Sequence, residues 1–175
     1  DQLTDLGIEV EGIEDIGNIG GNVVAGKGLS TQPHPNADSL KLCQVDIGQP
    51  EPLTIVCGAP NARPDIHVIV ATIGSVLPGN FKIKASKIRG ERSEGMMCSE
   101  SELGLSEEHD GIIELPEDAP LGAPFASVLG LDDPVIDIEL TPNRPDCTGV
   151  RGIARDLAAA GLGTLKTFDS AATVA

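Results

Sequence analysis

A series of short strand-like runs constrains the fold of this chain more than any other feature of its sequence. Within each run apolar residues either alternate with polar ones or stand together, and Gly, Pro, Asn or Asp residues separate one run from the next. The runs cover residues 8–16, 22–30, 40–48, 52–59, 66–74, 81–90, 111–115 and 134–140. The 21 Gly and 13 Pro residues suit such frequent turns. The pattern predicts a mainly β chain built around a small barrel or sandwich.

The last third of the chain changes character and predicts a helix. The segment TPNRPDC (141–147) contains two prolines, which break regular structure, and an amphipathic stretch follows at 150–163. Its apolar stripe consists of Val150, Ile153, Ala154, Leu157, Ala158 and Gly161. We expect Asp146 to cap this helix at its N-terminus.

Two shorter helical segments are also expected. Residues 99–105 could form one turn, with Ser99 as N-cap and Glu102 three residues later, and residues 124–131 could form another.

The composition limits the core and the classes of function. The chain has no Trp, no Tyr and three Phe, so the core must consist of Val, Ile, Leu and Ala. No apolar run approaches the ~20 residues that cross a bilayer, so we expect a cytoplasmic protein without a membrane partner. The four cysteines form no C-x-x-C pair and the three histidines are scattered. Because zinc ligands need close spacing, we expect buried free thiols and no metal site.

The stretch HPNADSLKLCQVDIG (34–48) places His34 and Asp38 four residues apart. A metal or acid–base site is one interpretation of this pair. Two flanking prolines forbid the helix that would bring the two side chains together, and Asn36 and Asp38 favour turns. We therefore interpret the stretch as a structural strand-to-strand connector or a partner contact.

Elsewhere the sequence contains no arrangement for bond-making. It has no Gly-rich phosphate loop, no G-x-S-x-G element and no set of His, Asp and Ser at a credible location for catalysis. We predict no catalytic residue. In TPNRPDC, structural roles are expected for Asn143, Arg144 and Asp146: Arg144 would bond carbonyls or a carboxylate across a domain junction.

The charge is unevenly distributed. The net charge of −15 argues against nucleic acid. However, five of the 12 basic residues lie close together, at Lys82, Lys84, Lys87, Arg89 and Arg92. On a strand, Lys82 and Lys84 would share one face, and such a line of cations suits a phosphate backbone. A solvated edge strand that prevents aggregation is the alternative. The segment 100–118, with eight acids and no Lys or Arg, would repel phosphate.

Several motifs together resemble one family. They are HPNADSLKLCQVDIG, IVCGAPN (55–61), VATIGSVLPG (70–79), KIRGERSEGMMCSESELGL (87–105) and IELTPNRPDCTGVRGIARDLAA (138–159). The first four resemble OB-fold tRNA-binding modules in general. The last is far more specific, and with it the chain resembles the N-terminal region of the bacterial phenylalanyl-tRNA synthetase beta chain.

This resemblance implies a fold. An OB-fold barrel of residues 22–131 would be inserted into a small discontinuous α/β or helical domain formed by residues 1–21 plus 132–175.

The resemblance also implies a function: a tRNA-binding and subunit-assembly region without catalysis of its own. Its partners would be tRNA, the synthetase alpha chain and the remainder of the beta chain. ATP and Mg²⁺ would serve the complete aminoacyl-tRNA ligase, with no cofactor in this region. Ser93 and Met96, from the family's S-x-G-M element, would help form the RNA surface, although Met96 could instead be buried in the barrel. A pure assembly module and a free-standing tRNA-binding protein are the alternatives.

Overall fold

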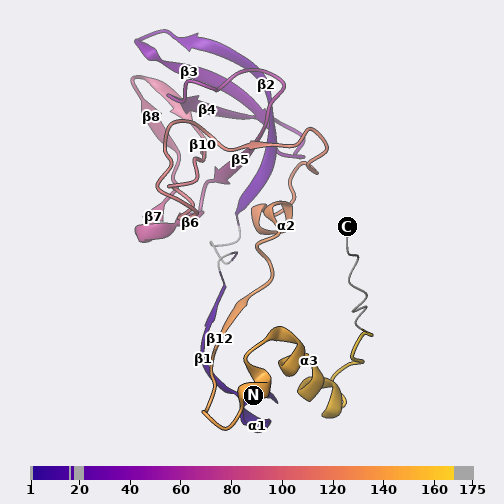
Figure 1. Cartoon of the computed structure of the whole chain (residues 1–175). Coiled ribbons are helices and arrows are strands. Elements are labelled where there is room, and N and C mark those ends of the chain that lie inside the picture. The colour runs from indigo at the N-terminus through magenta and orange to yellow at the C-terminus, as the bar shows by residue number, and fades with distance from the viewer. Residues whose placement is uncertain (1, 16, 18–21, 168–175) are drawn as a thin grey trace, which may run out of the picture. The chain divides into compact units, whose positions relative to one another are not determined.

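The computed structural model describes residues 2–15, 17 and 22–167 (Figure 1). These residues divide into two compact units, one of residues 15–134 and one of residues 1–14 with 135–175. Each unit is described by itself.

The larger unit is built on one antiparallel sheet. Its strands are β2 (Val23–His34), β3 (Ala37–Asp46), β4 (Leu53–Cys57), β5 (His67–Thr72), β10 (Gly95–Met97) and β11 (Glu114–Leu115). Their order is β10-β5-β2-β3-β4, and β11 also pairs with β5. The long strand β2 pairs with β5 through residues 23–27 and with β3 through residues 27–34, so it carries the sheet around a bend.

Three hydrogen bonds, two of them to side chains, bring the two ends of this sheet together without a regular ladder. The Val56 amide donates to Ser93 Oγ at 3.1 Å. The Glu94 amide donates to the Thr54 carbonyl at 2.8 Å, and the Thr54 amide donates to the Glu94 carboxylate at 3.3 Å. These bonds join β4 to the segment before β10 and nearly close the barrel. We call them the barrel seam.

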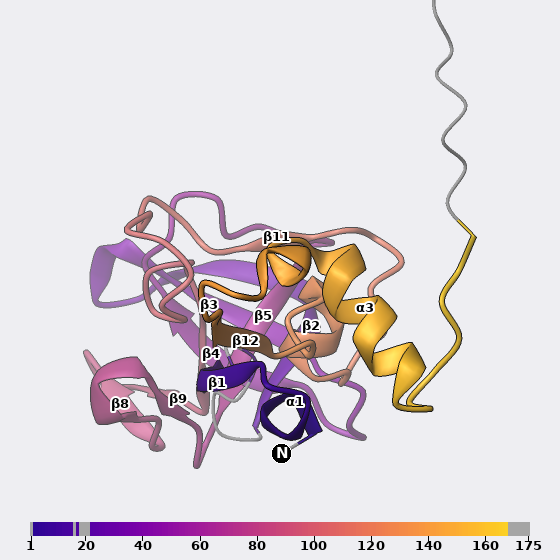
Figure 2. The same ribbon diagram turned by 60° about the horizontal axis from the view of Figure 1, so that its bottom comes forward.

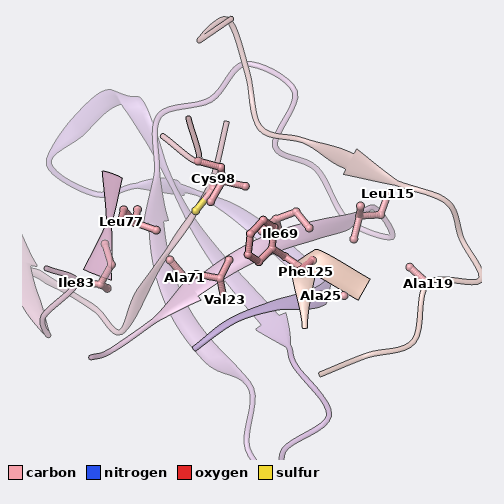
Figure 3. Packing of buried hydrophobic residues seen from close by; sticks show 12 residues of the cluster. Val23, Ala25, Ile69, Ala71, Leu77, Ile83, Cys98, Leu115, Ala119 and Phe125 are labelled. Atoms are coloured by element: carbon pink, nitrogen blue, oxygen red, sulfur yellow. The ribbon is translucent and has the colours of Figure 1, made fainter. Parts of the chain in front are cut away.

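Two apolar clusters line the opposite faces of the sheet. In β5, Ile69 and Ala71 belong to one cluster and Val68 and Val70 to the other, so this strand is buried on both faces. Its continuous apolar run is typical of such a strand. Figure 3 shows the first cluster, with Phe125 of α2 (Phe125–Leu129) packed near Ile69.

Short hairpins replace the single strand predicted at residues 81–90, and that prediction is wrong. The elements here are β6 (Val76–Leu77), η1 (Pro78–Asn80), β7 (Phe81–Lys82), β8 (Ser86–Ile88) and β9 (Glu91–Ser93). Ile83 follows β7 and is buried, and its backbone still bonds Gly74 and Ser75, whereas residues 84–85 belong to no strand.

The helical turn predicted at 99–105 is wrong as well. These residues form hydrogen-bonded turns, with the Glu102 carboxylate accepting from the Ser99 amide and hydroxyl.

The smaller unit contains a two-stranded ribbon and a helix. Its elements are α1 (Gln2–Asp5), β1 (Glu9–Glu14), β12 (Val135–Glu139), η2 (Pro145–Cys147) and α3 (Val150–Ala159). Strands β1 and β12 pair antiparallel with an irregularity between Val10 and Gly12, and they lie side by side in both views (Figure 1, Figure 2). Gly152 of α3 faces η2, where a Cβ atom would overlap the Asp146 carbonyl oxygen.

The predicted N-cap of the long helix is wrong. Gly149 holds the N-cap position without a side-chain bond, and α3 ends at Ala159 rather than at residue 163. Asp146 lies in η2 because its carboxylate binds arginines, as described below.

The fold class predicted from the sequence is confirmed: the chain is mainly β, with a barrel-like antiparallel sheet and a few helices. The four cysteines are buried free thiols, as predicted. None of the helices within the described ranges is long and apolar enough to span a bilayer.

Candidate nucleic-acid interface

The turn at His34–Asn36, which we call the HPN connector, is hydrogen-bonded to a second turn far away in the sequence. His34 is buried, and its Nδ1 accepts from the Asn36 amide at 3.0 Å. Because Nδ1 is an acceptor, Nε2 carries the proton and donates to the Ile88 carbonyl at 3.0 Å. Asn36 Nδ2 donates to the Arg89 carbonyl at 3.1 Å. The connector therefore holds the turn between β8 and β9, which begins 54 positions after His34.

This second turn presents a basic side chain. Ile88 and Glu91 are the last pair of the β8–β9 ladder, which leaves Arg89 and Gly90 as a two-residue turn. Both have positive φ, 53° and 102°. Two positive φ angles are the geometry of a type I′ hairpin turn, for which Gly is favoured and Arg is not. The Asn36 bond helps to hold the Arg89 backbone in this region, and the Arg89 side chain is left exposed at the tip.

The structure divides the predicted line of cations into two groups. Lys87, Arg89 and Arg92 belong to residues 86–93, which we call the basic hairpin, whereas Lys82 ends β7 and Lys84 lies between strands. All five side chains are exposed. Lys82 and Lys84 flank the buried Ile83, so both face solvent although no strand continues through them.

The basic hairpin concentrates positive charge without full compensation. Lys87 stands directly opposite Arg92 in the ladder, and like charges so placed repel each other. Arg92 forms an ion pair with Glu94 at 3.1 Å. Within the described ranges, Lys82, Lys84, Lys87 and Arg89 have no acidic partner. This arrangement favours an anion from outside.

The basic residues elsewhere in the larger unit are engaged. Lys27 pairs with Asp65 at 3.6 Å, and Arg63 forms two bonds of 2.7 Å with Glu114. Lys41 Nζ donates to three carbonyls of the loop after β4, the shortest bond being 2.8 Å to Ala62.

Ser93 occupies a different place from the one expected. Its side chain is 1% exposed, its hydroxyl accepts from the Val56 amide, and its single proton is donated to the Gly95 carbonyl at 3.1 Å. A hydroxyl has only one proton to donate, so donation to a phosphate would require breaking the bond to the Gly95 carbonyl. We therefore assign Ser93 a structural role instead of the expected phosphate contact.

Met96 lies at a groove in the larger unit. The groove has a volume of about 670 Å³ and is bounded by the β4 end, the turn at 99–102 and residues 109–112. Met96 is partly buried there, beside the buried Met97. Ile88 of the basic hairpin also lines the groove, which therefore opens beside the hairpin.

Acidic side chains occupy one side of this groove. Glu102 Oε2 accepts from the Ser99 amide at 2.5 Å and from the Ser99 hydroxyl at 2.6 Å. His109 and Asp110 lie on the same side. A hydrogen bond with the Glu107 carbonyl, and then the Asp110 carboxylate, raise the pKa of His109.

Asn61 anchors the rim of the groove, a role that sequence reasoning missed. Its side chain pairs with the Ile112 backbone as a strand would: Nδ2 donates to the carbonyl at 2.9 Å and Oδ1 accepts from the amide at 3.0 Å. Glu114, which also accepts from Asn61, is held by Arg63, and these hydrogen bonds lower its pKa. The only signal was Asn61 within IVCGAPN, without a partner visible in the sequence.

The remaining predicted structural residues differ in their environments. Asp38 and Asn143 are exposed, and neither side chain forms a hydrogen bond within the described ranges. Arg144 donates to the Leu6 carbonyl at 3.1 Å and to the carboxylates of Asp146 and Asp156. These partners all belong to the smaller unit, so Arg144 acts within it rather than across a junction.

Asp146, Cys147 and Asp156 lie close enough to resemble a metal site. Their acceptor atoms, however, already bind guanidinium groups: Arg155 lies 2.5 Å from Asp146, and Arg144 contacts all three side chains. Hydrogen bonds from Arg144 lower the pKa of Asp146 to about 2, and burial raises that of the Cys147 thiol. The donor set fits an ion-pair cluster rather than a metal ion.

Comparison with known proteins agrees with the resemblance. The family model described as "Putative tRNA binding domain" matches residues 23–124. The phenylalanine–tRNA ligase beta subunit of Photorhabdus laumondii is 56% identical over 160 residues, which are 91% of this chain and 20% of that protein. That of Bartonella henselae is 56% identical over 167 residues, 95% of this chain and 21% of that protein.

The chain thus spans about a fifth of the length of these curated relatives. Among solved structures, a MetRS-related protein from Pyrococcus horikoshii is 25% identical over 58% of this chain and 85% of that chain, with a TM-score of 0.43. The chain therefore belongs to the tRNA-binding domain family, and its resemblance to the beta chain of phenylalanyl-tRNA synthetases is confirmed.

Proposed function

We propose that the larger unit binds the phosphate backbone of tRNA through the basic hairpin, with Lys82 and Lys84 contributing. The observation that carries this proposal is the set of exposed cations without acidic partners, on a hairpin held in place by His34 and Asn36. Lys and Arg side chains that neutralise phosphates release counterions, which drives binding at low salt. The net charge of −15 makes the binding weak, and counterion release from each phosphate contact makes it steeply salt-dependent.

The proposal extends to the protein of which such a region forms part. In a complete phenylalanine–tRNA ligase this region would place tRNA and join the beta chain to its other subunit. ATP and Mg²⁺ would act elsewhere in that enzyme, and these residues would perform no catalytic step.

An assembly role is supported by the smaller unit. Val150, the first residue of helix α3, is 85% exposed, and Leu162, which follows the helix, is 45% exposed. Exposed apolar patches of this kind are typical of surfaces that another protein covers.

A pure assembly module is the second candidate, and the acidic segment 100–118 favours it because it would repel phosphate. The two candidates differ in their response to charge reversal. In log K against log salt, each phosphate contact contributes a slope of roughly −0.7 to −0.9.

The test measures binding of folded tRNA at several salt concentrations. Replacing Lys87→Glu together with Arg89→Glu removes two contacts and should flatten the slope by about 1.4 to 1.8. The matched control is Lys27→Glu with Lys166→Glu, the same charge change outside the hairpin, which should leave the slope nearly unchanged. Equal binding by wild type and both variants, or no binding by wild type at low salt, would favour the assembly module.

A further inference from the structure

The groove beside the basic hairpin has a mainly apolar lining. Leu40, Val56, Ile88 and Met96 contribute aliphatic or thioether surface, and a volume of about 670 Å³ lies within the usual range of ligand sites. Methionine is flexible and polarizable, so it adapts to the face of a flat ring. The groove can therefore accept a planar, uncharged group.

The Glu102 carboxylate, which Ser99 holds in place, indicates which kind of ligand group the groove can bind. Ser99 holds Glu102 through a single carboxylate oxygen, Oε2. The second oxygen, Oε1, has no hydrogen bond from any residue in the described ranges. Glu102 is exposed, and a carboxylate oxygen that is held in place without a protein partner favours a ligand with N–H groups and repels a phosphate.

The charge changes sign across a short distance. Ile88 lines the groove, and its neighbours Lys87 and Arg89 are exposed cations without acidic partners in the described ranges. A ligand that satisfies both features has a flat neutral part with N–H donors and an anionic part attached to it. An unpaired nucleotide has this chemistry, whereas a base within a helix is stacked and its edge is engaged.

We propose that the groove takes one unpaired nucleobase that carries an exocyclic amine, which donates to Glu102 Oε1 while the attached phosphates lie on the basic hairpin. Glu and Asp accept from the cytosine amine in the same way in nucleic-acid complexes. Uracil has a carbonyl at that position and would face the carboxylate with an acceptor. This inference rests on the proposed function and adds a base preference to it.

The experiment compares short single-stranded oligocytidine and oligouridine RNA, whose bases differ at C4, an amine against a carbonyl, and at N3, where only uracil carries a proton. Labelling methionine methyl groups with ¹³C gives two signals, since the chain has two methionines. The Met96 methyl should shift as the base enters. Oligocytidine should bind about tenfold more tightly than oligouridine, as expected for a hydrogen bond to a charged group.

Glu102→Gln should abolish this preference, because the amide can present a donor in place of the acceptor. Glu107→Gln is the matched control: it removes the same charge from an exposed site in the same segment, and it should keep the preference. The wild-type comparison of the two oligomers needs no variant, so it decides the question even where Glu102→Gln fails to fold.

Equal binding of the two oligomers would overturn the inference, as would an unmoved Met96 signal during binding. Tighter binding of an arginine-rich peptide in the groove would overturn it too, in favour of a protein ligand. If tRNA still binds through Lys87 and Arg89 in any of these cases, the proposed function stands and only the base site fails. If neither tRNA nor oligomers bind, both fail.

Discussion

Replacing Ser93 by alanine tests whether this residue closes the barrel. In the wild-type chain the Ser93 hydroxyl accepts from the Val56 amide and donates to the Gly95 carbonyl, and both Ser93 and Val56 are buried. Ser93→Ala removes the acceptor at the barrel seam. The Val56 N–H then lies in the protein interior without a partner, since β4 is the last strand of the sheet order on that side.

The expected loss of stability follows from these contacts. Leaving one buried donor without a partner costs about 1 to 3 kcal/mol. The Gly95 carbonyl adds little, because it is only partly buried and can bond water. We therefore expect Ser93→Ala to lower the free energy of unfolding by about 2 kcal/mol. Ser86→Ala is the control: Ser86 stands directly opposite Ser93 in the ladder but is exposed, so its loss should stay within about 0.5 kcal/mol.

The assay has to suit this composition. The chain has neither Trp nor Tyr, so urea unfolding is followed by far-ultraviolet circular dichroism rather than by fluorescence. Because the two units can unfold separately, hydrogen exchange at the Val56 amide provides a local readout. Exchange at this amide should become much faster in Ser93→Ala and stay unchanged in Ser86→Ala. A Ser93→Ala protein with wild-type stability and a protected Val56 amide would refute the role of Ser93 in the seam.

Two further predictions concern other contacts. Asn61→Ala should speed hydrogen exchange at the Ile112 amide and lower the free energy of unfolding by about 2 kcal/mol, because two bonds to the backbone are lost. The control Gln49→Ala, at an exposed position, should change neither quantity. An Ile112 amide that stays equally protected in Asn61→Ala would contradict this prediction. The pKa of Asp146 is lowered from 3.8 to about 2, so the folded state binds fewer protons than the unfolded state in this range. Its stabilisation is complete above about pH 3.8 and is lost as the pH falls towards 2. Exchange at the α3 amides should rise over that interval, and an Arg144→Met variant with the same pH profile would rule out the arginine contact as the cause.

The sequence by itself determined the local elements of this protein. Alternation and continuous apolar runs predicted strands that the structure contains, such as β5, whose burial on both faces is already visible in its run of apolar residues. The two prolines around His34 predicted a turn between strands, and the stripe from Val150 predicted α3. These features depend on side-chain periodicity and on restrictions of the backbone, and both are set by residues that are close together in the sequence.

Only the tertiary structure decided what the candidate site residues touch. Ser93 is separated by 37 positions from its partner Val56, and Asn61 by 51 from Ile112, and no local pattern records either pairing. The barrel must close before a hydroxyl at residue 93 becomes a buried acceptor instead of an exposed donor. In the same way, the break between β7 and β8 divides the basic residues into two groups, which charge spacing along the sequence could not reveal. Local periodicity is set by the backbone, whereas the burial and pairing of one polar side chain depend on which distant strand packs against it.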